Sequence, residues 1–204
     1  MPYNRMAALC YAGMFYNRIC HDGKNSTRRG YLPVINGVRL TPGLLMSDIG
    51  PMPDDDFDCT HFISCCLGQA QGRIDVNGTQ VMFTGGGLPI RSPFKERGIY
   101  GEDYAPRLVA WLLAIGAKQV SPHRFLAQGD YYFTDRMVRE NLRPGDVIAF
   151  SDDEKVNRDG TGNYKHMVLV VGNGGLISCH TTSQFGESYR NIKHGHMTLL
   201  KLPN

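Results

Sequence analysis

The sequence predicts an α+β fold, in which N-terminal helices pack on a C-terminal antiparallel β-sheet. Two observations predict the α+β class. Helical patterns come first along the chain, and apolar strand-like runs separated by turn residues fill the C-terminal half. With 204 residues, 42% of them hydrophobic and 20% charged, the chain suits one domain with an ordinary core. We therefore expect a single domain over residues 1–204.

Three segments carry apolar residues at helical spacing, at about residues 4–20, 59–67 and 103–117. Asn4 is a candidate N-cap for the first of them. Asp58 is the N-cap candidate of the second, and Gly68 is its stop signal. The second helix is short and begins at Cys59.

The expected strands of the sheet lie in "RPGDVIAF", in "YKHMVLVVGNGGLISCHT", which reads as strand, turn and strand, and in the terminal "HMTLLKLPN". Asp146 in the first of these segments is expected to hold a turn. Two loop-rich insertions, at about residues 21–52 and 69–103, each contain an Asn-Gly pair that predicts a small hairpin. Three consecutive glycines, 85–87, predict a mobile loop.

Charge and hydropathy exclude several classes of protein. A net charge of +3, without basic residues interleaved with aromatic ones, does not indicate nucleic-acid binding. No stretch is apolar enough to insert into a membrane, and the N-terminus lacks the apolar core of a cleavable signal. We expect a chain synthesised in the cytoplasm as a soluble protein.

Six cysteines raise the question of metal and disulfide sites. None forms a C-x-x-C pair, and their spacing does not resemble a small disulfide framework, so we predict no metal and no cofactor. Cys66 is expected in the core, and Cys65 receives no assignment.

Cys59 has the position of a nucleophile. A thiol in the first turn of a helix lies among unpaired backbone N–H groups at the positive end of the helix dipole. These groups favour a thiolate and can stabilise an oxyanion. A buried structural cysteine is the alternative for this stretch alone.

His166 and His180 are the candidate partners of Cys59, because each ends an apolar strand. Facing residues of an antiparallel hairpin have numbers with a constant sum. A three-residue turn centred on Asn173, with Gly174 left-handed, would place both histidines on one face. A two-residue turn would place them on opposite faces.

The segments "DCTHFISCCL", "RPGDVIAF" and "HMVLVVGNGGLISCHT", together with "YNRMAALCYAGMFYN", resemble the NlpC-type peptidases and the amidase-domain branch of the papain-like superfamily. The resemblance implies that Cys59 is the nucleophile, His166 the general base and acid, and His180 the third, orienting residue. His61 departs from the family pattern, which has Asn there. Asp58 and His61 are candidates for substrate binding.

The resemblance implies a cysteine hydrolase that cleaves amide bonds in the peptide stems of peptidoglycan. Without an ordinary signal, such an enzyme would reach the wall or a target-cell periplasm through a dedicated secretion system, as an antibacterial effector or lysin with an immunity partner. One alternative is a cytoplasmic amidase, transamidase or deamidase of a small molecule or protein side chain. Another is a non-catalytic papain-fold binding module.

Overall fold

The α+β class is confirmed by the computed structural model. The structure describes residues 2–17, 20, 34–35, 38–39, 58–68, 71–74, 80–83, 85–90, 102, 104–120, 124–125, 131–152, 162–180, 183–193 and 195–204. Its helices are α1 (Arg5–Phe15), α2 (Cys59–Leu67), α3 (Ala105–Ala114) and α4 (Tyr131–Asn141), with a short 3-10 turn at Tyr189–Asn191. None of the helices in this part of the chain has the length and apolar character to cross a bilayer.

One antiparallel sheet forms the C-terminal half. Its strands run in the order β10-β9-β8-β7-β11-β5, and β6 also pairs with β11. Their bounds are β5 (Lys118–Gln119), β6 (Arg124–Phe125), β7 (Val147–Ser151), β8 (His166–Gly172), β9 (Leu176–Cys179), β10 (Gln184–Ser188) and β11 (His196–Lys201). The three expected strand regions are therefore confirmed.

The two small hairpins in the loop-rich segments are also confirmed. β1 (Val34–Ile35) pairs with β2 (Val38–Arg39), and β3 (Gln71–Ile74) pairs with β4 (Gln80–Phe83), both antiparallel. The Asn-Gly turns themselves lie outside the described residues, as does most of both insertions.

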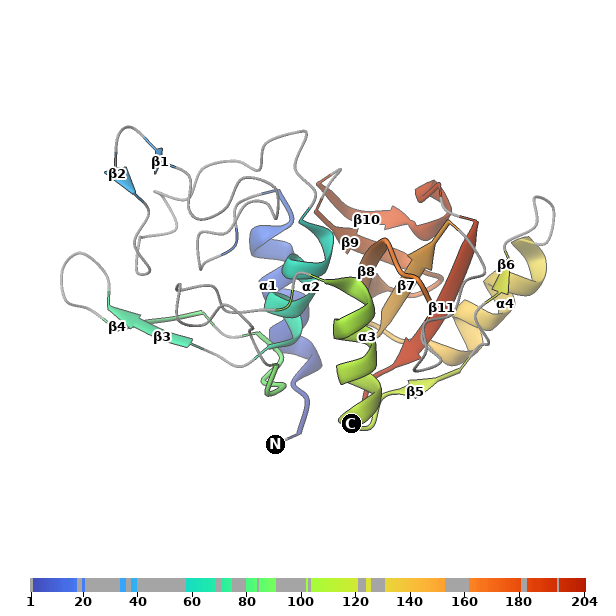
Figure 1. Cartoon of the computed structure of the whole chain (residues 1–204), viewed down its shortest axis with the longest axis horizontal. Coiled ribbons are helices and arrows are strands. Elements are labelled where there is room, and N and C mark those ends of the chain that lie inside the picture. The colour runs from blue at the N-terminus through green and yellow to red at the C-terminus, as the bar shows by residue number, and fades with distance from the viewer. Residues whose placement is uncertain are drawn as a thin grey trace.

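The central sheet is covered on both faces (Figure 1). On one face, α1, α2 and α3 pack against side chains such as Met167 and Leu169 of β8. On the other face, Val138 of α4 packs against Phe150 and Val168. Every residue of α2 is buried, which is typical of a helix enclosed within a core. The first residue of α2 is therefore held rigidly against the sheet.

α1 begins and α2 ends as the sequence predicts. Asn4 Oδ1 accepts a hydrogen bond from the Ala7 N–H and so caps α1, which ends earlier than expected, at Phe15. α2 runs from Cys59 to Leu67 with Gly68 as its C-cap. The helix α4 was not predicted, because its apolar residues are too sparse to form a clear stripe.

The glycine run 85–87 packs against the end of α2, with Gly85 and Gly86 buried and Gly87 half-buried. The N–H groups of Gly86, Gly87 and Leu88 donate to the carbonyls of Cys66, Gly68 and Leu67, at 2.7, 2.7 and 2.9 Å. The last carbonyls of a helix have no N–H donors within the helix, so the N–H groups of this segment satisfy the C-terminal end of α2. A Cβ on Gly85 would lie 2.3 Å from the Cys65 carbonyl oxygen, which explains the need for glycine there.

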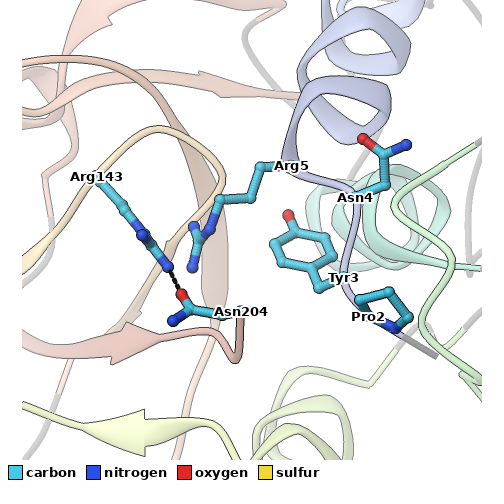
Figure 2. Close-up of a pocket in the computed structure, with 6 residues that line it drawn as sticks. All are labelled: Pro2, Tyr3, Asn4, Arg5, Arg143 and Asn204. Carbon is cyan, nitrogen blue, oxygen red and sulfur yellow. Dashed lines mark hydrogen bonds between the residues drawn. The ribbon is translucent and has the colours of Figure 1, made fainter.

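Arg5 ties the N-terminus to the sheet. Its guanidinium donates to Asp146 Oδ1 at 2.7 Å and to the Leu202 carbonyl at 2.8 Å. Asp146 also accepts from the Arg143 N–H, so it holds the turn before β7 as predicted. Figure 2 shows the pocket beside this cluster, which is lined by Pro2, Tyr3, Asn4, Arg5, Arg143 and Asn204. None of the predicted catalytic residues lines this pocket.

Candidate active site

Cys59 is the first residue of α2 and lies against β8. The backbone N–H of Met167 points at its sulfur, and Thr60 Oγ1 lies 3.9 Å from the same atom. Met167 directly follows His166 in β8. The fold therefore brings the start of α2 next to the start of β8, where the sequence placed its two principal catalytic candidates.

Burial raises the pKa of the Cys59 thiol, although the N–H groups of Met167 and Thr60 act in the opposite direction. Cys59 is only 7% exposed. The helix position alone had suggested a thiolate, but burial outweighs the helix N-terminus. The resting group at neutral pH is a thiol, and it must lose its proton to a base in order to attack.

His166 opens β8 and is buried. It pairs with Phe150 of β7, and the centroids of the two rings lie 6.3 Å apart. Phe150, Val168 and Val170 belong to the core on the α4 side of the sheet. Because side chains alternate along a strand, His166 shares their face, whereas Met167 faces the helices.

The hairpin register differs from the prediction. The turn between β8 and β9 has three residues, 173–175, and Gly174 is left-handed with φ +76° as expected. It is, however, centred one residue later, and the register shifts again between Val170 and Gly172, so that Leu169 pairs with Ser178. Extended by two residues, this register sets His180 opposite Met167 and puts the two histidines on opposite faces. The prediction of one shared face is therefore wrong.

His180 lies on the helix side of the sheet and contacts both α1 and α2. Its Nδ1 is 3.2 Å from Asp58 Oδ2, and its Nε2 is 2.8 Å from the Phe15 carbonyl oxygen. Its ring stacks on Phe62 with 4.0 Å between centroids. Both polar partners are acceptors, so His180 engages each of them through a ring nitrogen that can carry a proton.

Asp58 links two histidines instead of capping α2. Its side chain makes no cap hydrogen bond, and Oδ2 lies 3.2 Å from Nδ1 of His61 as well as from His180. Burial would raise the pKa of Asp58, but the charge and hydrogen bonds of the two histidines lower it. The side chains of Asp58 and His61 are fully buried. Neither offers surface to a substrate, which corrects their assignment as substrate-binding candidates.

A second group of reactive side chains surrounds His61. Cys65 Sγ lies 3.5 Å from His61 Nε2, and the ligand atoms of Cys20, His61 and Cys65 all lie within 4.8 Å of one another. All three side chains are buried. No C-x-x-C pair marks this group in the sequence, so it was not predicted. The available signal was the spacing of His61 and Cys65, four residues apart on one helical face.

The remaining cysteines behave as expected. None of the six cysteines, all of which lie within the described residues, forms a disulfide. Cys66 belongs to the core, and burial raises the pKa of its thiol well above the usual range. Cys10 on α1 is exposed.

One family model, described as the putative amidase domain, matches residues 2–199 of the chain. No curated protein and no solved structure gives a significant match.

Proposed function

Because the chain belongs to the family of the putative amidase domain, which indicates hydrolysis of amide bonds, we propose that it is a cysteine hydrolase with Cys59 as nucleophile and His166 as general base. The observation that carries this proposal is the position of the Cys59 sulfur against the Met167 N–H, one residue from His166. The resemblance of the sequence motifs to NlpC-type peptidases supports the same assignment and a papain-like fold.

The chemistry follows from a nucleophile that rests as a thiol. His166 begins β8, so for this step its ring has to reach around the end of the strand to the helix side, where Cys59 lies. It then accepts the Cys59 proton as the sulfur attacks the carbonyl carbon of the amide. The N–H groups in the first turn of α2, starting with that of Cys59, donate to the oxyanion. The protonated His166 then gives its proton to the leaving amine. Water, activated by His166, hydrolyses the resulting thioester and releases the free enzyme.

We assign His180 a positioning role that differs from the one the family resemblance implies. Its ring nitrogens engage Asp58 and the Phe15 carbonyl, so it joins the start of α2 to the end of α1. His180 therefore fixes the helix that presents Cys59, through Asp58, rather than the ring of His166. This role predicts that loss of His180 lowers stability and activity together, whereas loss of His166 lowers activity alone.

We further propose that the substrate amide belongs to the peptide stems of peptidoglycan. The order of the Cys, Gly-Asp, His and His-Thr segments resembles that of the NlpC-type peptidases, and this resemblance supports the choice. Delivery by a dedicated secretion system and neutralisation by an immunity protein are parts of the same proposal. Both rest on the wall substrate, because a hydrolase of peptidoglycan has to reach the wall.

The test is digestion of purified peptidoglycan followed by mass spectrometry of the released fragments. Wild type should release new amine and carboxyl ends, and Cys59→Ala should lose at least about 1,000-fold in rate. Cys10→Ser, which removes an exposed thiol, is the matched control and should retain full activity. Identical fragment profiles for wild type and Cys59→Ala would contradict a wall substrate. Hydrolysis of other amides that still requires Cys59 would leave only the broader proposal standing.

A further inference from the structure

We propose that Cys20, His61 and Cys65 form a binding site for a thiophilic transition metal, with zinc as its expected occupant. The three ligand atoms lie within 4.8 Å of one another in the core between α1 and α2. The site is separate from the proposed catalysis, which uses neither these thiols nor this imidazole.

The orientation of His61 is the first argument. Its Nδ1 faces Asp58 Oδ2 at 3.2 Å, and an ionised carboxylate can only accept, so Nδ1 carries the ring proton. The neutral ring then presents the lone pair of Nε2 toward Cys65. Histidines that bind metals are oriented in this way, with the other ring nitrogen donating to a carboxylate.

The spacing of the ligands is the second argument. Two ligands on one tetrahedral zinc, with Zn–S of about 2.3 Å and Zn–N of about 2.0–2.1 Å, stand about 3.6 Å apart. The separation of Cys65 Sγ from His61 Nε2 is 3.5 Å. His61 and Cys65 are also one helical turn apart on a rigid, buried helix, so their relative position is set by α2.

The type of ligand selects the metal. Two thiolates and one imidazole suit zinc, whereas magnesium and calcium take oxygen ligands. Three protein ligands leave a fourth position for water or another small ligand. Asp58 stays behind the His61 ring as its hydrogen-bond partner and does not serve as the fourth ligand.

Such a metal would join parts of the chain that are distant in sequence. Cys20 follows α1, whereas His61 and Cys65 belong to α2, so the metal would hold the segment after α1 against α2. Cys20 Sγ also lies within 4.8 Å of a carboxylate oxygen of Asp58 and a ring nitrogen of His180. It therefore lies between the proposed metal ligands and the Asp58–His180 pair. The metal would support the same helix that presents Cys59.

The test combines metal analysis with cobalt substitution in the full-length protein under reducing conditions. Protein purified without chelator should hold about one zinc per chain. Cobalt(II) bound to stripped wild type should show the sulfur-to-cobalt charge-transfer absorption of thiolate ligation. Cys20→Ser and Cys65→Ser should each weaken that absorption and metal retention, while Cys10→Ser should change neither. Asp58→Asn should weaken metal affinity by about 10- to 100-fold.

Two results would overturn the site. One is wild-type protein that neither retains zinc nor develops the charge-transfer band when cobalt is added, a readout that does not depend on any variant folding. The other is a Cys20–Cys65 disulfide, seen by peptide mapping as the stable form in fresh protein, which would make the pair redox-active instead.

Discussion

Replacing Asp58 by asparagine should destabilise the fold strongly without changing the shape of the side chain. Asp58 Oδ2 lies 3.2 Å from Nδ1 of both His61 and His180, and all three side chains are fully buried. Nε2 of His180 also lies 2.8 Å from the Phe15 carbonyl oxygen, so the same ring is held from both sides. An asparagine in place of Asp58 is neutral and keeps only one oxygen, so it cannot offer a charged acceptor to both histidines.

The loss follows from the hydrogen bonds that the buried carboxylate accepts from the two histidines. Two hydrogen bonds to a charged group are worth about 1.5–3 kcal/mol each, or about 3–6 kcal/mol together. We therefore expect Asp58→Asn to lower the free energy of unfolding by about 3–5 kcal/mol, a large part of the stability of an ordinary domain.

The assay is equilibrium unfolding in urea at neutral pH, with reductant and a metal chelator present so that metal loss does not contribute. Glu140→Gln is the matched control, because it removes a carboxylate from the exposed pair with Arg136 and should cost under about 1 kcal/mol. In a His180→Gln background, the cost of Asp58→Asn should fall by more than about 1 kcal/mol. A loss no larger than that of the control, or no coupling to His180, would refute the reasoning.

Three further predictions follow from the packing and the site. Gly85→Ala should lower the free energy of unfolding in urea by more than about 3 kcal/mol, because the added Cβ meets backbone atoms. Gly87 has φ +83° and open space around it, so Gly87→Ala should lower the same free energy by about 1–2 kcal/mol. Equal losses for the two variants would contradict the clash at Gly85. Burial raises the pKa of Tyr3, so above pH 10 the unfolded chain loses the phenol proton while the folded chain keeps it. The free energy of unfolding of wild type should therefore fall by about 1.4 kcal/mol per pH unit relative to that of Tyr3→Phe. Parallel profiles of unfolding free energy against pH for the two proteins would contradict this. His166→Ala should lower kcat about 100-fold or more with an unchanged urea midpoint, and retained activity would remove it from the mechanism.

The short-range features of the sequence predicted most of the fold. The apolar spacing of α2 and its stop at Gly68 specified both ends of that helix, because these signals act within one or two turns of the chain. The same logic placed β8 and β9, whereas the three-residue turn, one of the two turns that the sequence allowed, lies one residue later than expected. The helix α4 was not predicted from the sequence because only part of it, around Val138, faces the core. Its exposed face carries charged pairs such as Arg136 with Glu140.

The features that failed depend on long-range packing. A register shift between Val170 and Gly172 moves His180 to the other face, and no local pattern in a run of valines and glycines specifies such a shift. The role of Asp58 changed for a similar reason. An aspartate before a helix is usually a cap, but here His180, far along the chain, lies close enough to engage it. The group around Cys20 likewise exists only because α1 and α2 pack together.

The contacts at the end of α2 also join the two ends of the segment between Gly68 and Leu88. Gly87 N–H donates to the Gly68 carbonyl, and Gly68 forms a parallel bridge with Leu88, so the chain leaves α2 and returns to the same place. The excursion between them, which includes the β3–β4 hairpin, is a loop with its ends joined. Because closure entropy changes slowly with loop length, the part of this excursion before Gly85 can be lengthened or shortened at little cost in closure entropy. The length and sequence of this segment can thus change during evolution without moving Cys59.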